Sequence, residues 1–494
     1  MPEEFDRDLQ SIQEARRLVA KAAEAQRVFA TFNQYEVDTV VGAMAEAAYR
    51  SSEKLAKLAK EETGIGNVPH KIVKNQFASK DVWEAIKDVK TVGVVGRDDA
   101  KRIVEIAWPY GVVASLTPVT NPTSTVIHNV LVAVKARNAI VCTPHPNAVR
   151  CAGESARIME EAAVAAGAPA GLVSCMSHVS LQGTEELMKH KDVRLIVATG
   201  GTAMVRAAHS MGKPVYGVGP GNVPVYVDRT ADIEHAAKAI INSVSFDFGV
   251  ICASEGTIVA DKPIAEQLEA ALKRNGAHFL NDVEAELLGK AMFRPNGMMQ
   301  ADFVGRSPLE LGQLVGFPVP DGTRILVARY YEIGPSVPLS GEKLAPVVGF
   351  MVEDGWRRGC ERSIEVLHFE GEGHTMGIHC KDEGIIMQFG LEKPVFRIIV
   401  NGSTTSGGIG ATTGIDPSMT LATGGIGGGI SSDNISVQHM MNVKRLAYEL
   451  TPFEPPVVAS MNPAAAPAAA PTASAGMDVE AIVRKVLEQL SQRS

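Results

Sequence analysis

The 494-residue sequence is poor in cysteine, has no excess of positive charge and contains no long apolar run. Its six cysteines form no C-x-x-C pair and no zinc-ligand spacing, so we expect no disulfide framework, no metal site and a reducing compartment. With 48 basic and 56 acidic residues, the net charge of −8 provides no overall field to attract nucleic acid or an anionic membrane.

No membrane or export signal stands out either. The most apolar stretch, residues 162–176, falls short of the roughly 20 residues that cross a bilayer. The first ten residues (MPEEFDRDLQ) are acidic and polar, whereas a signal peptide needs a basic start and then an apolar core. The sequence therefore predicts a cytoplasmic protein with no nucleic-acid and no membrane partner.

Several common site motifs are also missing. No clean G-x-G-x-x-G follows a predicted strand, and there is no P-loop, no H-E-x-x-H and no G-x-S-x-G. Isolated glycine pairs such as Gly200-Gly201 are weak signals by themselves.

The apolar pattern predicts an α/β protein. Helical spacing covers residues 8–32 and 37–62, and the glycine-rich segment 63–67 ends the second helix. From 111 to 227, short apolar strands alternate with helices, and a second α/β block covers about 229–423. This order is typical of parallel sheets covered on both faces, which bind nucleotides at the carboxyl ends of their strands.

Residues 91–107 break this alternation. Two β-rich runs flank Gly96-Arg97-Asp98-Asp99, which predicts a hairpin with its turn at 96–99. Such a hairpin is either an arm that pairs with another subunit or an internal element.

The C-terminal segment has a different composition. Residues 462–475 read NPAAAPAAAPTASA, and prolines at this spacing exclude a continuous helix and favour an extended spacer. In residues 477–494, six aliphatic side chains between Val479 and Leu490 share one helical face. An isolated helix of this length is marginal in water, so the stripe predicts a binding partner. Folding back on its own domain, self-association and membrane-surface contact are the alternatives.

Cys252 is the strongest candidate for a chemical role. It lies in residues 246–255 (FDFGVICASE), where a cysteine is either a nucleophile or a small core residue. The segments around it resemble the aldehyde dehydrogenase superfamily over roughly residues 10–450. Five motifs carry the resemblance in order: a strand and its loop at 109–122 (PYGVVASLTPVTNP), a cofactor-phosphate turn at 198–202 (ATGGT), the loop that ordinarily carries the general base at 219–224 (GPGNVP), the nucleophile segment at 249–254 (GVICAS), and the nicotinamide-ribose motif at 342–347 (EKLAPV).

The resemblance implies an aldehyde dehydrogenase-like α/β fold with a parallel-sheet, Rossmann-like cofactor domain, an α/β catalytic domain and a β-hairpin oligomerisation arm. It divides the chain into five parts: a cofactor domain at 1–228, a catalytic domain at 229–423, a returning oligomerisation segment at 424–460, an Ala/Pro linker at 461–476 and an amphipathic targeting helix at 477–494.

One departure from the family pattern indicates the subtype. Hydrolytic members carry a glutamate six residues before the proline that matches Pro224, and this sequence has Val218 there. Water attacking a thioester needs a positioned base, which valine cannot supply. Residues 371–375 (GEGHT) and the sequence around Cys252 (FDFGVICASE) resemble the CoA-acylating branch, in which coenzyme A takes the acyl group.

The implied reaction starts with attack of Cys252 on a short-chain aldehyde and passes through a Cys252 thioester to acyl-CoA and NADH. NAD is the implied cofactor, with NADP possible, and coenzyme A is the co-substrate. The oxyanion donors would be the Cys252 N–H with Thr120 or Asn121, although Asn121 equally suits the cap of the next helix.

The resemblance also implies a set of binding residues. Glu342 would hold the nicotinamide ribose, and His374 would assist cofactor or CoA binding unless it is only structural. The remaining cofactor-binding positions are Pro118, Thr199, Gly200, Gly201, Thr202 and Gly219, for which a structural turn is the alternative role.

The tail resembles the encapsulation peptides of bacterial microcompartments. This implies shell or cargo partners, bound through the stripe between Val479 and Leu490, and a location inside a microcompartment. The hairpin suggests a homodimer or homotetramer. Two other functions remain open: a hydrolytic aldehyde dehydrogenase, and a non-catalytic cargo or scaffold protein.

Overall fold

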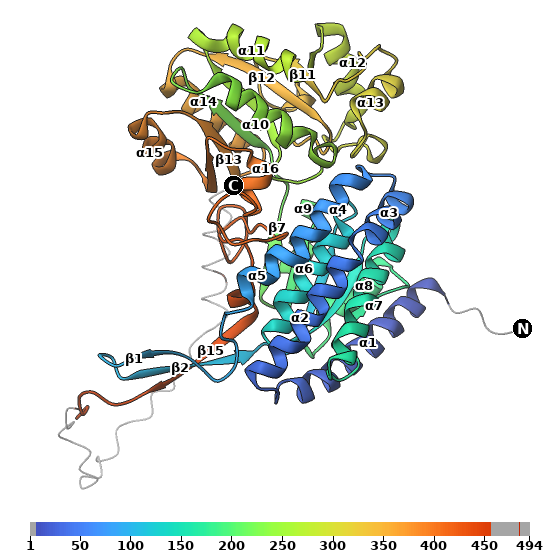
Figure 1. Cartoon of the computed structure of the whole chain (residues 1–494), viewed down its shortest axis with the longest axis vertical. Coiled ribbons are helices and arrows are strands. Elements are labelled where there is room, and N and C mark those ends of the chain that lie inside the picture. Colours follow the sequence, from blue (N-terminus) through green and yellow to red (C-terminus); the bar gives the residue numbers. More distant parts are fainter. Residues whose placement is uncertain (1–5, 456–483, 485–494) are drawn as a thin grey trace, which may run out of the picture. The chain divides into compact units, whose positions relative to one another are not determined.

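The computed structural model describes residues 6–455 and residue 484 (Figure 1). Residues 1–447 form one compact unit and residues 448–494 a second. The predicted linker and targeting helix lie outside the described residues, apart from Arg484.

A layer of helices precedes the first parallel sheet. It comprises α1 (Arg7–Phe29), α2 (Gln34–Arg50), α3 (Ser52–Thr63), α4 (Val68–Gln76) and α5 (Val82–Ile86), with the π-helical turn η1 (Phe77–Asp81) between the last two. The prediction of one helix over 37–62 is wrong. The Ser52 hydroxyl donates to the carbonyls of Ala48 and Tyr49 and competes with the helical ladder, so α2 ends and α3 begins there. Gly64, with φ of 68°, ends α3 as predicted.

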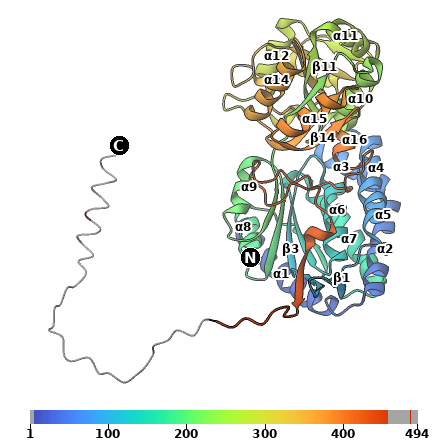
Figure 2. The ribbon, with the colours of Figure 1, turned by 90° about the vertical axis from the view of Figure 1, so that its left-hand side faces the viewer.

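The first sheet has five parallel strands in the order β5-β4-β3-β6-β7. Figure 2 shows α8 and α9 on one side of β3, with α6 and α7 on the other. Every residue of α6 is buried, which places this helix in the core. The elements are β3 (Val112–Thr117), α6 (Pro122–Lys135), β4 (Ala139–Pro144), α7 (Val149–Ala165), β5 (Val173–Cys175), α8 (Leu181–Lys189), β6 (Val193–Thr199), α9 (Thr202–His209) and β7 (Val215–Val218).

The second sheet has seven parallel strands in the order β10-β11-β12-β9-β8-β13-β14. Strand β8 falls inside the predicted cofactor domain at 1–228, but it pairs with β9 and β13 of this second sheet, so the second sheet begins before the predicted boundary. The strands are β8 (Val223–Val227), β9 (Glu255–Asp261), β10 (Ala277–Phe279), β11 (Ile325–Arg329), β12 (Val347–Glu353), β13 (Gly373–His379) and β14 (Val395–Val400).

Seven helices accompany this second sheet: α10 (Ile233–Ser245), α11 (Ala265–Arg274), α12 (Asp282–Met292), α13 (Pro308–Val315), α14 (Trp356–Phe369), α15 (Glu383–Glu392) and α16 (Thr404–Gly408). Short 3₁₀ turns complete the connections: η2 (Pro146–Ala148), η3 (Phe246–Gly249), η4 (Lys262–Ile264), η5 (Ala301–Phe303), η6 (Pro338–Ser340) and η7 (Val437–Met440).

The expected hairpin is present, and a third strand joins it. β1 (Val94–Asp98) pairs antiparallel with β2 (Ile103–Pro109), which pairs in turn with β15 (Met441–Ala447) (Figure 1). The turn lies at residues 99–102 rather than 96–99, because Gly96, Arg97 and Asp98 pair across the ladder. Trp108 on this sheet is 52% exposed.

Candidate active site

A turn of unusual backbone conformation precedes Cys252. Asp247, Phe248 and Gly249 in η3 have φ of 49°, 57° and 71°, so three consecutive residues are left-handed. Glycine adopts this conformation freely, whereas other residues persist there only when the surroundings hold them, often at functional sites. The chain then passes through the partly buried Cys252 and enters β9.

Helix α4 holds this turn in place through Asp247. The fully buried carboxylate of Asp247 pairs with Lys71, at 3.1 Å from Nζ to Oδ2, and with Lys74. It also accepts the N–H of Asn67 at 2.7 Å, and the Asp247 N–H donates to His70 Nδ1 at 2.8 Å. Burial opposes ionisation of Asp247, but Lys74 and Lys71 hold its pKa below the usual value. The strained turn is therefore fixed by buried polar contacts.

Lys74 connects this cluster to Asn121. Burial lowers the pKa of Lys74 to about 7, and its Nζ lies 2.6 Å from Asn121 Oδ1. Because the amine can donate to that oxygen, the contact favours Oδ1 facing Lys74 and Nδ2 facing away. The amide Nδ2 then donates to Val250 O at 3.2 Å and to Thr120 Oγ1 at 3.1 Å.

Asn121 occupies the N-cap position of α6, but its side chain makes no capping bond, so the interpretation of its side chain as the helix cap is wrong. Both of its amide hydrogens are used by Val250 and Thr120. The Thr120 hydroxyl accepts from Asn121 and keeps its own hydrogen. Because no described residue accepts that hydrogen, Thr120 can donate it to an oxyanion, and Asn121 orients the hydroxyl.

The Cys252 thiol is strongly protonated in this environment. Burial, followed by the negative charge of Glu342, raises its pKa to about 12, while Arg397 acts in the opposite direction. The backbone N–H groups of Cys252 and Ala253 also lower the pKa, because they hydrogen-bond the sulfur. The site thus contains groups that stabilise a thiolate, but burial outweighs them.

Gly221 is the point at which the predicted residues meet. A Cβ built there would lie 2.0 Å from Cys252 O and 3.3 Å from His374 Cδ2, so only glycine fits. Its N–H donates to Glu342 Oε1 at 2.8 Å. Burial raises the pKa of Glu342 to about 8. Cys252, Glu342 and His374 are therefore assembled around one glycine from three separate segments.

His374 is buried and neutral. Burial, with the nearby charge of Arg397, takes its pKa well below the usual value. Its Nδ1 lies 3.0 Å from Thr375 Oγ1, and its Nε2 has no hydrogen-bond partner among the described residues.

The strand order of the first sheet reverses between β3 and β6, and the carboxyl ends of the strands at such a reversal are a common place for nucleotides to bind. Thr117 and Thr199 end these strands, and their buried hydroxyls have no partner among the described residues. Pro118 follows β3 directly, and Thr202 begins α9.

The start of α9 leaves its backbone donors available. Gly201 is the N-cap and has no side chain to cap the helix, and the N–H groups of Thr202 and Ala203 have no partner among the described residues. A Cβ at Gly201 or Gly219 would meet nothing within 4 Å, whereas one at Gly200 would lie 3.2 Å from Met204 Sδ. Backbone donors, open space and unpaired hydroxyls fit a dinucleotide phosphate.

Val218 ends β7 and is buried at 2% exposure. In the described part of the chain, Glu342 is the carboxylate whose charge acts most on Cys252. The position expected to hold a hydrolytic base is therefore apolar.

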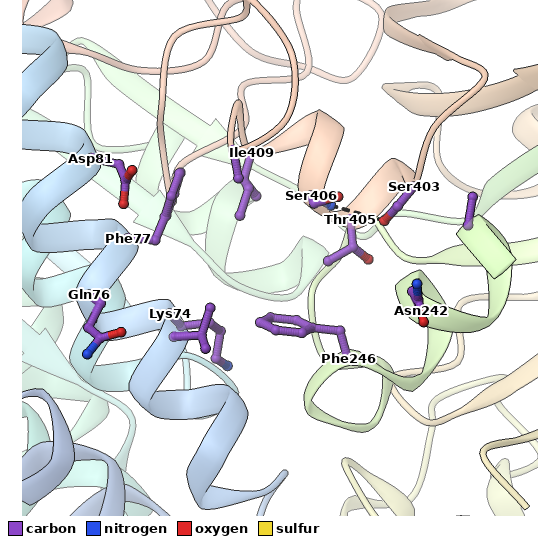
Figure 3. A pocket seen from close by; sticks show the side chains of 13 residues that line it. Lys74, Gln76, Phe77, Asp81, Asn242, Phe246, Ser403, Thr405, Ser406 and Ile409 are labelled. Carbon is purple, nitrogen blue, oxygen red and sulfur yellow. Dashed lines mark hydrogen bonds between the residues drawn. The ribbon is translucent and has the colours of Figure 1, made fainter. Parts of the chain in front are cut away.

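The pocket shown in Figure 3 was not predicted from the sequence. This cavity of about 420 Å³ lies between α4, α10 and the segment 403–411. Two contacts connect its surroundings to the nucleophile segment. Lys74 bonds to Asn121, whose amide donates to Val250 O, and Thr404, between two lining residues, donates to Ala253 O at 2.6 Å. The lining comprises Val73, Lys74, Gln76, Phe77, Asp81, Ala239, Asn242, Phe246, Ser403, Thr405, Ser406, Ile409 and Ala411.

Sequence reasoning also missed Lys71, Lys74 and Arg397. The two lysines are three residues apart on α4, a spacing that puts both on one helical face, but nothing in the sequence shows that this face is buried. Within residues 6–455, no group of three or more His, Cys, Asp or Glu side chains could hold a metal ion. No helix in this range is long and apolar enough to cross a membrane.

Two parallel sheets, a strand-order reversal with open backbone donors, and a cysteine on a braced turn define a two-domain α/β protein suited to cysteine chemistry beside a dinucleotide. A model of the Aldehyde dehydrogenase family matches residues 8–280. The chain belongs to this family, and the predicted α/β class is confirmed.

Known proteins resemble the chain over most of its length. The acetylating aldehyde dehydrogenase of Geobacillus thermoglucosidasius is 48% identical, with a TM-score of 0.90 over 91% of this chain and 99% of that one. A propionaldehyde dehydrogenase from the fucose-utilisation microcompartment of Clostridium phytofermentans is 27% identical, with a TM-score of 0.80 over 88% and 97%.

Among curated proteins, aldehyde-alcohol dehydrogenase 2 of Entamoeba histolytica is 39% identical over 442 residues, which cover 87% of this chain and 51% of that protein. The chain thus spans about half the length of the curated relatives it matches first.

Proposed function

We propose that this protein is a CoA-acylating, NAD-dependent aldehyde dehydrogenase that converts a short-chain aldehyde and CoA to acyl-CoA. The observation that carries the proposal is the buried Val218, which stands where a hydrolytic base is expected, beside an otherwise complete cysteine site. The likeness to an acetylating aldehyde dehydrogenase and to a propionaldehyde dehydrogenase supports it.

The edge of the first sheet between β3 and β6, with the start of α9, is the proposed cofactor site. The open N–H groups at Gly201 and Thr202 would bind phosphate, and Glu342 would accept hydrogen bonds from ribose hydroxyls. NAD, when bound there, supplies the hydride acceptor.

Cys252 forms the first bond. Cys252 reacts as the thiolate, after its proton has passed to solvent. The sulfur attacks the aldehyde carbon, and the carbonyl oxygen becomes an oxyanion that accepts from the Cys252 N–H and the Thr120 hydroxyl. Asn121 and Lys74 keep Thr120 oriented for this step. Loss of hydride leaves an acyl thioester on Cys252.

The second half of the reaction exchanges one thioester for another. The CoA sulfur attacks the acyl carbon, and Cys252 leaves as a thiolate. This exchange needs no base to activate a water molecule, which agrees with the valine at position 218.

The pocket of Figure 3 is the proposed aldehyde site. Val73, Phe77 and Phe246 give it apolar walls, and Ser403, Thr405 and Ser406 add hydroxyl groups. A cavity of about 420 Å³ suits a small acyl group carrying at most a few polar atoms.

We also propose that the enzyme is a homodimer or homotetramer that assembles through the β1-β2-β15 sheet. Exposed Val94, Trp108 and Leu446 on this sheet support an interface.

The tail between Val479 and Leu490 is proposed to bind microcompartment shell or cargo proteins, which places the enzyme in a microcompartment of the cytoplasm. One structural relative from a microcompartment supports this proposal.

A CoA-dependence assay tests the activity. Wild-type protein should form NADH from acetaldehyde or propionaldehyde in repeated turnovers only when CoA is present, and Cys252→Ser should form none. Val218→Glu restores a carboxylate at the end of β7 and should yield free acid without CoA, provided that circular dichroism and NAD binding show an intact fold. Sustained wild-type turnover without CoA would contradict the proposal.

A second candidate, hydrolysis, rests on Glu342. This carboxyl has a pKa of about 8 and acts electrostatically on Cys252, so it is the available alternative base. If Glu342 were that base, CoA-free acid formation would occur in wild-type protein and disappear in Glu342→Gln.

A further inference from the structure

His374, Thr375 and Arg397 form a buried row of polar side chains beside Cys252. Thr375 and Arg397 are register partners on β13 and β14, and none of the three is more than 3% exposed. Arg397 Nε donates to Thr375 Oγ1 at 3.2 Å, and Thr375 Oγ1 lies 3.0 Å from His374 Nδ1. A guanidinium, a hydroxyl and an imidazole are thus connected in series.

The direction of the hydrogen bonds along this row is determined by Arg397. A guanidinium can only donate, so Thr375 Oγ1 accepts from it. The described residues then offer the Thr375 hydroxyl hydrogen one acceptor, His374 Nδ1. The opposite arrangement, in which His374 Nδ1–H donates, would leave the hydroxyl hydrogen buried without a partner.

One edge of the imidazole faces Gly221, which packs against the backbone of Cys252. His374 Nε2 has no partner among the described residues. The adjacent ring atom, Cδ2, is 3.3 Å from a Cβ position at Gly221, and that same position is 2.0 Å from Cys252 O. The edge of the ring that carries Nε2 therefore borders the reacting segment.

We propose that Arg397 and Thr375 are positioning residues that hold His374 in its neutral Nε2–H form, so that His374 is a hydrogen-bond donor to the reacting sulfur or oxygen atoms at Cys252 and not a base. This inference deepens the proposed acyl transfer and rests on it. Burial and the charge of Arg397 keep the pKa of His374 low, which agrees with a neutral ring.

In this arrangement the thiol proton of CoA goes to solvent and not to His374. An Nε2–H group has no lone pair to take the thiol proton, so CoA reacts as the thiolate that ionises in solution. When its sulfur bonds to the acyl carbon, the sulfur of Cys252 leaves with the electron pair, and the His374 N–H stabilises the negative charge throughout. Among the described residues, Arg397 acts on the charge of His374, and Cys252 and Glu342 lie around the neighbouring Gly221.

The tautomer is tested without catalysis. Nitrogen-15 spectra of histidine-labelled full-length protein, assigned with His374→Gln, should show a protonated Nε2 and an unprotonated Nδ1 for His374. Thr375→Ser keeps the hydroxyl and should preserve this pattern, whereas Thr375→Val has a similar size and should alter it. A protonated Nδ1 in wild-type protein would overturn the proposal, whatever the activity of the enzyme.

Kinetics distinguish a donor from a base. Acyl transfer to CoA, measured by rapid mixing, should slow by about 10²-fold in His374→Ala, and His374→Gln should stay within about tenfold of wild type because an amide still donates. A glutamine variant as slow as alanine would overturn the donor role.

The pH dependence of the wild-type rate is a second test. The rate of acyl transfer should rise with pH as the CoA thiol ionises, and a histidine-like inflection near neutral pH would also contradict the proposal. Absence of CoA-dependent turnover in wild-type protein would refute the proposed function instead.

Discussion

Glu342 acts on the charge of Cys252. Because burial raises the pKa of Cys252 to about 12, the ligand-free thiol should react slowly with iodoacetamide at pH 7, and its rate should keep rising above pH 9. Glu342, with a pKa of about 8, becomes negative near that pH and then opposes thiolate formation. Glu342→Gln removes this charge and should speed alkylation, mainly above pH 8.

Mass spectrometry of the modified peptide gives the rate at Cys252, and Cys252→Ser gives the background from the other cysteines. Equal rates in wild type and Glu342→Gln across the pH range would show that Glu342 does not act on the thiol.

The sequence predicted the site residues that lie in recognisable motifs. It missed the residues whose role depends only on where the fold places them. Cys252, Glu342 and His374 follow from ordered segments, and the fold brings all three to Gly221. Lys74 and Arg397 were missed because charged side chains are expected at the surface, and their burial depends on contacts between distant segments.

The turn before Cys252 is the element whose stability matters most. Asp247→Asn would leave two buried lysines without a counter-charge, which we expect to cost about 3–5 kcal/mol. Lys74→Met leaves Asp247 paired with Lys71 and should cost less, yet it removes the anchor of Asn121. We therefore expect Asp247→Asn to lower the melting temperature more, and Lys74→Met to lower kcat at nearly normal stability.

Differential scanning fluorimetry and steady-state kinetics on the same preparations check this order. As a surface control, Lys57→Met removes an exposed partner of Glu53 and should change neither quantity measurably. A larger thermal effect in Lys74→Met would contradict the charge balance described for the cluster.

The ends of helices and strands are predicted less well than the elements themselves. The break at Ser52 depends on hydrogen bonds of one hydroxyl, and the position of the hairpin turn depends on which residues pair across the ladder. Apolar periodicity encodes neither. β15 was expected only as a returning segment, because its pairing with β2 joins residues more than 300 positions apart. The parallel strands were predicted more reliably, since burial on both faces gives continuous apolar runs.

For the whole molecule, the tail should be separable from catalysis. A chain ending at residue 455 keeps both parallel sheets and every site residue discussed above. We expect unchanged kcat, KM and oligomeric state, with loss of co-purification with microcompartment shells. Light scattering, kinetics and shell co-purification from cells check these outcomes, and a scrambled stripe between Val479 and Leu490 is the matched control. Retained encapsulation would contradict a targeting role, and a monomeric full-length protein would contradict the proposed assembly.

The high pKa of Cys252 has a consequence for how long each enzyme molecule survives. Peroxides and electrophiles attack thiolates far faster than thiols, so a resting enzyme that keeps its sulfur protonated resists inactivation between turnovers. The same burial that suppresses the nucleophile therefore preserves it, and oxidative loss should be concentrated in molecules caught during the catalytic cycle.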